Sequence, residues 1–171
     1  CRQTVRSLHR RHPGAAIILT GCYAQLKPEE AASLDGVAVV AGNDKKGRVI
    51  EYIEQWLADR APRREVTAAK EIRDFTPSCS RGDRTRYFLK VQDGCDCWCT
   101  YCAIPAARGR SRSGSIASLV RQAEDAAAAG GREIVITGVN IGDFGKRGPD
   151  GLAPENREDF LRLIMALDRV E

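Results

Sequence analysis

The stretch from residue 94 to residue 102, GCDCWCTYC, holds four of the seven cysteines of this 171-residue chain. Cys95, Cys99 and Cys102 follow the spacing C-x3-C-x2-C, which can bring three thiolates around one 4Fe–4S cluster. A cluster with three protein ligands keeps one iron that can bind a small molecule, whereas a cluster with four cysteine ligands only transfers electrons. The spacing therefore predicts a cluster that takes part in chemistry.

Cys97 offers two alternatives to this interpretation. As a fourth ligand to iron, it would make the chain an iron–sulfur electron carrier. Together with the other three cysteines it could instead hold a structural zinc ion in a basic, tRNA-binding module. Structural zinc usually takes two C-x2-C pairs from separate places, so four ligands in one short loop would need a contorted backbone. We therefore expect Cys97 to be a spare thiol, and we assign no role to Cys79.

Composition and charge limit the classes of protein that fit. The odd number of cysteines and the lack of a secretory leader argue against a disulfide framework, so reduced thiols are available as ligands. No apolar run is long enough to span a bilayer, and we expect a cytoplasmic protein that has no membrane partner. The chain begins without a methionine and ends inside an apparent helix, so we expect it to be an excerpt from a longer protein.

The net charge of +4 is unevenly placed along the chain. The basic stretch RGDRTRYFLK precedes the cysteines, and RGRSRSG follows them. Such flanking charge suits a polyanionic partner such as nucleic acid, and a solvated surface is the alternative.

The first part of the chain alternates helical and strand patterns, which implies a parallel α/β sheet. The predicted helices cover residues 2–12, 28–34 and 47–57, and the predicted buried strands cover 15–20 and 36–42. Residues 59–85 carry many charges and two prolines with little periodicity, so we expect them to form a linker.

The second part predicts one βαβ unit of a parallel barrel or an open sheet. Residues 87–93 form a strand pattern that ends at the cysteines, and residues 132–138 form the next strand pattern. Between them, Ser115 is a plausible N-cap of a helix and Gly130 a plausible stop. This order places the cysteine loop at the carboxyl end of the first strand, where such folds hold their chemistry.

The cysteine spacing and its strand–loop–helix setting resemble the radical S-adenosylmethionine superfamily. That resemblance implies that the amino and carboxylate groups of S-adenosylmethionine bind the open iron, and that reductive cleavage gives a 5'-deoxyadenosyl radical. The residue before the last cysteine is usually aromatic in that superfamily and lies against the adenine. Tyr101 holds that position here.

Three stretches together resemble the methylthiotransferases, and they look closest to the branch that acts on threonylcarbamoyladenosine beside the tRNA anticodon. The stretches are TGCYAQLKPEE, FLKVQDGCDCWCTYCAIPAARGRSRSG and EIVITGVNIGDFG. The resemblance implies that residues 1–58 are the later part of an N-terminal α/β domain that holds an auxiliary cluster. Residues 86–171 would then be the first βαβ part of a radical S-adenosylmethionine domain, which is a partial TIM-type barrel. Within the family, isopentenyladenosine in tRNA is the alternative substrate.

The resemblance also implies the cofactors and partners. Cys22 matches the third ligand of the auxiliary 4Fe–4S cluster, and the other two ligands would lie upstream of Cys1. One S-adenosylmethionine would methylate a sulfur associated with that cluster, and a second would yield the radical. The radical would abstract hydrogen from the substrate, and the methylthio group would be installed at carbon 2 of the base. The partners would be tRNA and an external electron donor, while the oligomeric state stays open.

The remaining candidates follow from their proximity to the cysteine loop. We expect Ile104 and Pro105 to cover the cofactor. Gly138 and Asn140 follow the second strand, where they could meet the bound methionine moiety or form a simple turn. Three arginines could contact phosphates or the cofactor carboxylate, with ordinary surface charge as the alternative: Arg108, Arg110 and Arg112.

Overall fold

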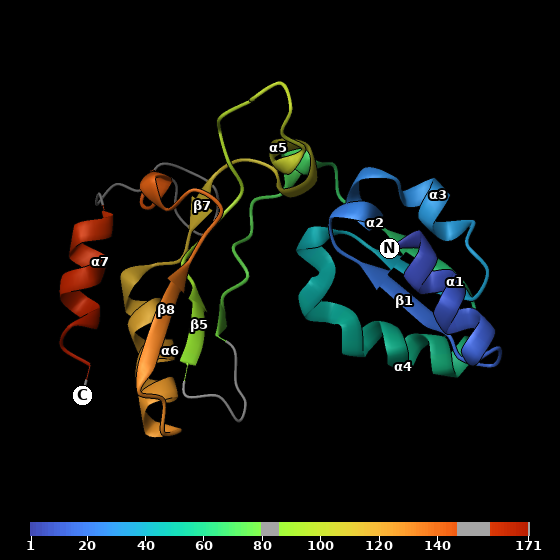
Figure 1. Cartoon of the computed structure of the whole chain (residues 1–171), viewed down its shortest axis with the longest axis horizontal. Coiled ribbons are helices and arrows are strands. Elements are labelled where there is room, and N and C mark those ends of the chain that lie inside the picture. Colours follow the sequence, from blue (N-terminus) through green and yellow to red (C-terminus); the bar gives the residue numbers. More distant parts are fainter. Residues whose placement is uncertain (80–85, 147–157, 171) are drawn as a thin grey trace. The chain divides into compact units, whose positions relative to one another are not determined.

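The computed structural model describes residues 1–79, 86–146 and 158–170, and the chain folds into two compact units (Figure 1). The first unit comprises Cys1–Glu71 together with Ala106–Arg108, and the second comprises Ile72–Pro105 and Gly109–Glu171. Each unit is described by itself.

The first unit is built on a parallel sheet of three strands, in the order β1-β2-β3. The strands are β1 (Ile17–Thr20), β2 (Val37–Ala41) and β3 (Arg63–Glu65). The helices are α1 (Arg2–Arg11), α2 (Cys22–Leu26), α3 (Pro28–Ala32) and α4 (Val49–Asp59), with the 3-10 helix η1 (Asn43–Arg48) before α4. This arrangement confirms the predicted parallel α/β segment.

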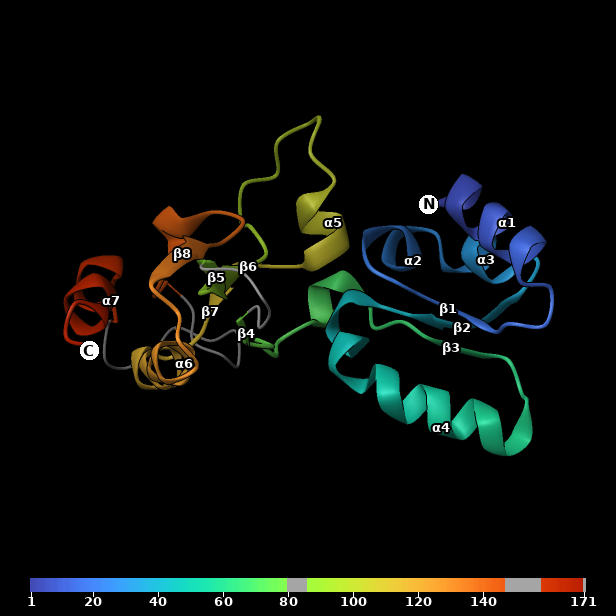
Figure 2. The same ribbon diagram turned by 60° about the horizontal axis from the view of Figure 1, so that its bottom comes forward.

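The alternation of side chains along β2 gives this unit a core on each face of its sheet. Val40 packs with Ala24 and Ala31 on the face covered by α2 and α3 (Figure 2). Val39 packs on the opposite face with Tyr52 of α4, whose hydroxyl donates to Glu65 of β3 at 2.9 Å. Strand β1 was expected to be buried, but its residues are half-buried or exposed because it lies at the edge of this sheet.

The second unit contains the predicted βαβ arrangement. Strands β5 (Arg86–Lys90) and β8 (Glu133–Thr137) pair in parallel, and α6 (Ile116–Ala128) connects them. Ser115 caps α6 by accepting a hydrogen bond from the Ser118 amide at 3.3 Å, as predicted. The helix ends at Ala128, before Gly130, whose φ of +88° suits a glycine after a helix.

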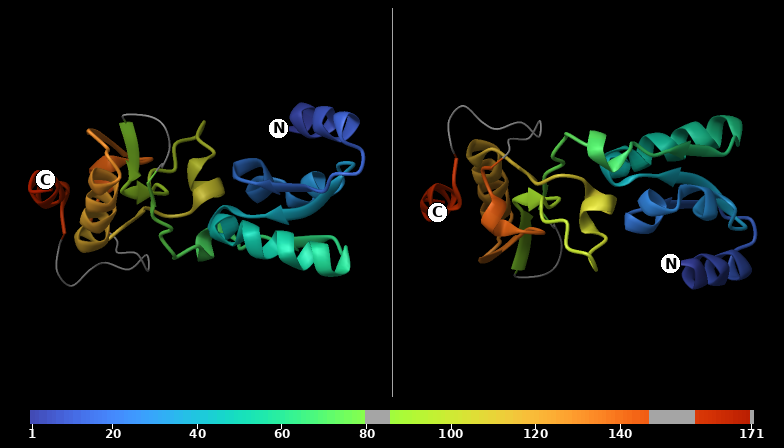
Figure 3. Two further views of the ribbon diagram at one scale, coloured as in Figure 1. Left: turned by 90° about the horizontal axis from the view of Figure 1, so that it is seen from below. Right: turned by 90° about the horizontal axis from the view of Figure 1, so that it is seen from above.

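The core of the second unit lies between this sheet and α6. Leu89 of β5 and Leu119 of α6 are completely buried there, together with Leu163 of α7 (Phe160–Leu167). Helix α7 lies beside α6 (Figure 3). Within the described residues the parallel pairing of the second unit is limited to β5 and β8, so the structure shows an α/β unit and the partial barrel stays a prediction.

Two predicted boundaries differ from the structure. Residues 59–85 were expected to be a linker, yet they supply β3 to the first sheet and β4 (Ser78–Cys79), which pairs antiparallel with β5, to the second. The predicted strand 87–93 is divided, because β6 (Gln92–Asp93) leaves the sheet and pairs antiparallel with β7 (Arg112–Ser113). Strands of two or three residues are too short to produce a periodic pattern.

Among the described helices, none combines the length and the apolar character that a membrane crossing would require.

Candidate functional site

The cysteine loop, residues 94–103, connects β6 to α5 (Ile104–Arg108) and has no helix or strand of its own (Figure 1). Its base is fixed by the Cys95 amide, which donates to the Gly109 carbonyl at 3.1 Å. Gly94 has a φ of +73°, and a Cβ at this position would collide with the backbone carbonyl of Arg110. Glycine is therefore required by both the conformation and the close approach.

All four thiols of this loop are free. Cys95 and Cys102 are half-buried, whereas Cys97 and Cys99 are exposed. A turn closes between the last two candidate ligands, since the Cys102 amide donates to the Cys99 carbonyl at 3.0 Å. Soft thiolates on an irregular, accessible loop form a donor set that fits an iron–sulfur cluster.

The thiols are not gathered into a preformed site, because the described residues contain no group of three acidic, histidine or cysteine side chains arranged to hold a metal ion. Metal sites are rarely preformed before binding, so a loop of this kind would have to close around its cluster. The structure thus places Cys95, Cys99 and Cys102 on one loop without joining them.

Cys97 differs electrostatically from a ready ligand. Its backbone amide donates to the Cys95 sulfur at 3.4 Å. The hydrogen bond with the Cys95 side chain and the negative charge of the Cys95 thiolate raise the pKa of Cys97, and burial and the Asp143 carboxylate add to the effect. A thiolate at Cys97 is disfavoured beside these groups, so the neutral thiol prevails at neutral pH.

The cofactor candidates lie at two places around this loop. Tyr101 is 90% exposed, as is most of neighbouring Trp98, so the loop presents two aromatic rings to solvent. Ile104 and Pro105 begin α5, with Pro105 buried and Ile104 half-buried. Trp98 was not among the sequence candidates, although an exposed tryptophan beside candidate ligands offers a surface for stacking.

Gly138 and Asn140 lie at the same end of the sheet as the cysteine loop. They follow β8, which is parallel to β5, and the Val91 amide after β5 still donates to the Thr137 carbonyl at 2.9 Å. The carboxyl ends of parallel strands lie at the same edge of a sheet, so the loop after β8 and the start of the cysteine loop are neighbours. The buried side chain of Gln92 joins them, and no pattern in the sequence indicated it.

A contact of Arg112 with RNA or the cofactor stays a prediction, and the surroundings of this residue do not favour it. Arg112 is only 3% exposed, and its Nε donates to the Asp74 carbonyl at 2.8 Å. Its guanidinium also donates to the Arg110 carbonyl at 3.1 Å and faces Asp93 at 3.6 Å. An arginine held by these internal partners is structural. Arg110 is exposed and Arg108 is half-buried.

Cys22 occupies the corresponding edge of the first unit. It begins α2 directly after β1, and Asn43 follows β2, so both residues stand at the carboxyl ends of adjacent parallel strands. The Asn43 Nδ2 donates to the Cys22 sulfur at 3.8 Å. Apart from exposed Cys1, Cys22 is the only cysteine in residues 1–71.

A buried glutamine supports Asn43. The Gln25 Oε1 accepts a hydrogen bond from the backbone amide of Asn43 at 2.9 Å. The Gln25 Nε2 donates to the Thr67 carbonyl at 2.7 Å. Neither Asn43 nor Gln25 was among the sequence candidates, since single amides follow no spacing rule. Together they hold the position of the residue that contacts Cys22.

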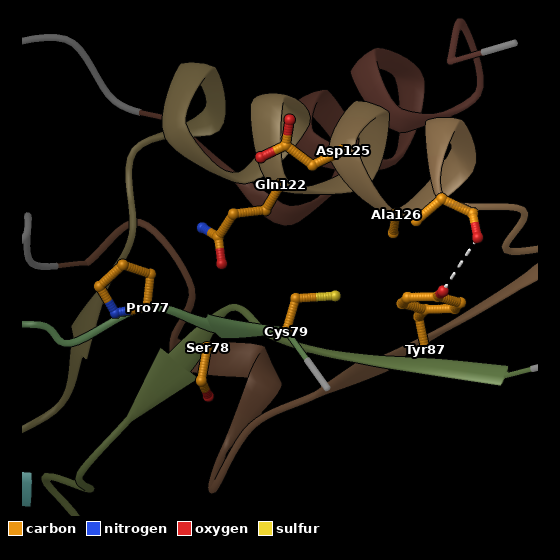
Figure 4. A pocket seen from close by; sticks show the side chains of 8 residues that line it. Pro77, Ser78, Cys79, Tyr87, Gln122, Asp125 and Ala126 are labelled. Carbon is orange, nitrogen blue, oxygen red and sulfur yellow. Dashed lines mark hydrogen bonds between the residues drawn. The ribbon is translucent and has the colours of Figure 1, made fainter. Parts of the chain in front are cut away.

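A separate cavity of the second unit lies between α6 and the strands β4 and β5 (Figure 4). Cys79 and Tyr87 line one side of it, and Gln122 and Asp125 line the other. The Tyr87 hydroxyl donates to the Ala129 carbonyl at 3.4 Å. None of the described residues that line this cavity belongs to the cysteine loop or to the loop after β8, so it is not the candidate site.

The sequence is similar to that of tRNA methylthiotransferases. The chain is 37% identical over 175 residues to the threonylcarbamoyladenosine tRNA methylthiotransferase MtaB of Bacillus subtilis, covering 99% of this chain and 37% of that protein. It is 38% identical to MtaB of Aquifex aeolicus, covering 84% of this chain and 36% of that protein. It is 30% identical to the tRNA-2-methylthio-N(6)-dimethylallyladenosine synthase of Clostridium novyi, covering 98% of this chain and 37% of that protein.

The chain thus spans little more than a third of the length of these curated relatives. No protein-family model matches it.

Proposed function

This chain belongs to the methylthiotransferase family, and on that premise we propose that the protein is a radical S-adenosylmethionine enzyme that adds a methylthio group to tRNA. The observation that carries the proposal is the similarity to MtaB proteins, which reaches 40% identity over most of the chain. Threonylcarbamoyladenosine is the proposed substrate, and carbon 2 of its base is the site of modification. Dimethylallyladenosine, another name for isopentenyladenosine, is the second candidate substrate. Relatives whose names contain that nucleoside are 30–33% identical.

The second unit is proposed to be the first βαβ part of a radical S-adenosylmethionine barrel. Cys95, Cys99 and Cys102 would hold its 4Fe–4S cluster, and Cys97 would remain a thiol. When bound, this cluster supplies the electron that cleaves S-adenosylmethionine, and its open iron receives that cofactor. The chain contributes a loop whose base is fixed at Gly94 while its thiols remain accessible.

Five residues are proposed to bind S-adenosylmethionine. The ring of Tyr101 can lie against the adenine, because it is exposed and would lose no packing contacts by stacking on a ligand. Ile104 and Pro105 would shield the cofactor from water on the α5 side. Gly138 and Asn140 would contact the methionine moiety from the loop after β8, where the side-chain amide of Asn140 offers both a donor and an acceptor.

The first unit is proposed to hold one ligand of an auxiliary 4Fe–4S cluster, Cys22. Asn43 would orient that sulfur through the hydrogen bond already present. We further propose that an external electron donor serves the protein, and that it works in the cytoplasm on tRNA.

Arg108 and Arg110 are proposed to contact tRNA phosphates, and this gives a first prediction. We expect the double variant Arg108→Ala and Arg110→Ala to weaken tRNA binding and to lower the slope of log K against log salt by about one per lost phosphate contact. Binding measured by fluorescence anisotropy across a salt series would show this. Arg132→Ala is the matched control, because Arg132 is exposed in the second unit but lies outside the loop. An unchanged slope in the double variant would return both arginines to ordinary surface charge.

Metal analysis after anaerobic purification tests the proposed function against its alternatives. The proposal expects iron and sulfide, with a spectral change when S-adenosylmethionine is added to the reduced protein. Iron and sulfide without that change would support an electron carrier. Zinc without iron would support an RNA-binding module and remove the radical mechanism.

A further inference from the structure

Gln92 places a buried amide at the base of the cysteine loop. Its side chain is 1% exposed. The Nε2 donates to the Gly94 carbonyl at 2.8 Å, to the Ser111 hydroxyl at 2.9 Å and to the Asp93 carbonyl at 3.0 Å. Both N–H groups of the amide are therefore used, and they hold the start of the cysteine loop to the segment that follows α5.

The other half of the same amide holds the loop after β8. The Gln92 Oε1 accepts from the Val139 amide at 2.9 Å and from the Asn140 amide at 2.8 Å. These backbone groups are donors only, so the orientation of the Gln92 amide follows from its partners. Both lone pairs of the oxygen are occupied, and the side chain is completely satisfied.

The backbone after β8 comes unusually close to this glutamine. A Cβ at Gly138 would lie 3.1 Å from the Gln92 Oε1 and 3.2 Å from its Cβ. These distances are tighter than most real Cβ contacts, so glycine lets the two segments approach. The close packing against Gln92 therefore explains the glycine at position 138 without any ligand.

A buried amide with these partners fixes geometry in a way that an apolar side chain does not. Apolar contacts are non-directional, whereas each hydrogen bond constrains a distance and an angle. Gln92 applies such constraints to two irregular loops at once. One contains the candidate ligand Cys95, and the other carries the cofactor candidate Asn140.

We propose that Gln92 is a positioning residue that sets the distance between the cluster loop and the loop after β8, so that S-adenosylmethionine bound at the cluster meets Asn140. This inference rests on the proposed function for the identity of the cofactor. Gln92 itself touches neither cluster nor cofactor and acts through the Gly94 carbonyl and the Val139 and Asn140 amides.

The test uses two substitutions in the full-length protein. Gln92→Leu removes all the hydrogen bonds at similar volume, and Gln92→Glu keeps an acceptor for Val139 and Asn140 but places an oxygen against the Gly94 carbonyl. Gln122→Glu is the matched control, because its half-buried amide donates to the Ser118 carbonyl of its own helix at 3.2 Å. Iron content and thermal unfolding are measured for each variant.

We expect both Gln92 variants to retain iron and to raise the KM for S-adenosylmethionine by about 10- to 100-fold, with a smaller change in kcat, as is typical when an outer-shell partner is lost. The electron paramagnetic resonance change on adding the cofactor should shrink in parallel. Hydrogen exchange gives a readout without cofactor: Gln92→Leu should speed exchange at Val139 and Asn140 about tenfold, the effect of losing a typical hydrogen bond.

Unchanged KM and unchanged exchange in folded, iron-containing variants would overturn the inference. So would loss of iron and of thermal stability in both variants, because Gln92 would then serve the fold and not the alignment. If the unsubstituted protein itself shows no response to S-adenosylmethionine, the proposed function fails, while accelerated exchange at Val139 and Asn140 would still support the coupling of the two loops.

Discussion

Replacing Cys95, Cys99 or Cys102 by alanine is expected to abolish cleavage of S-adenosylmethionine by the reduced full-length protein. Each substitution removes one of the three proposed protein ligands of the radical cluster, and a cluster with two thiolates is not retained. The measurement is chromatography of 5'-deoxyadenosine, with the iron content of each variant determined in parallel.

Cys97→Ala is the control for this experiment, because Cys97 lies on the same loop and is exposed like Cys99. Truncating an exposed thiol leaves no cavity, so thermal unfolding of Cys97→Ala should match that of the parent. Cys99→Ala should instead unfold like the parent without its cluster, because a bound cluster stabilises the fold. Cys97→Ala should also retain cleavage. A Cys99→Ala variant that keeps its iron and still cleaves the cofactor would contradict the assigned ligands, and loss of cleavage in Cys97→Ala would make Cys97 a ligand.

Cys22→Ala is expected to separate two activities. Cys22 belongs to the first unit, at the carboxyl end of β1, and the radical cluster is assigned to the second unit. The variant should therefore still release 5'-deoxyadenosine in the presence of a reductant, but it should leave threonylcarbamoyladenosine in tRNA without a methylthio group. Both products can be measured by chromatography of one reaction.

Two further variants accompany Cys22→Ala: Asn43→Ala is a second test of this site, and Cys79→Ala is a control. Asn43→Ala removes the hydrogen bond to the Cys22 sulfur and should reduce methylthiolation without stopping cofactor cleavage. Cys79→Ala should change neither activity, because Cys79 lies on β4 and lines the cavity beside α6, which is separate from the candidate site. Methylthiolation at the parent's rate by Cys22→Ala would make Cys22 a structural thiol. Loss of both activities would end the proposed division between the two clusters.

Much of the fold could be predicted because the longer elements have clear patterns. The runs around Val39 and Leu89 are apolar enough to indicate buried strands, and the helix after Ser115 has both a cap and a stop. Strands β3 and β4 could not be predicted, since β3 reads Arg-Arg-Glu and β4 has two residues. Their pairing depends on tertiary neighbours that local sequence does not encode.

The candidate site was predictable only where its residues follow a spacing rule. Three cysteines at fixed intervals indicate a cluster, whereas Gln92 and Asn43 are single amides whose roles depend on distant backbone groups. The surroundings of Arg112 could not be predicted because a basic stretch usually lies at the surface, and only the structure shows its guanidinium bound to internal carbonyls. Burial of one charge within a basic run leaves no mark in the sequence.

The most direct test of the central claim is mass spectrometry of the nucleosides of tRNA after reaction with the reconstituted full-length protein, S-adenosylmethionine and a reductant. Two tRNA substrates are compared, one carrying threonylcarbamoyladenosine and the other dimethylallyladenosine. We expect a methylthio group on threonylcarbamoyladenosine, with one 5'-deoxyadenosine released for each group added. Methylthiolation confined to dimethylallyladenosine would contradict the proposed substrate, and modification of neither nucleoside by a protein that carries both clusters would contradict the proposed function.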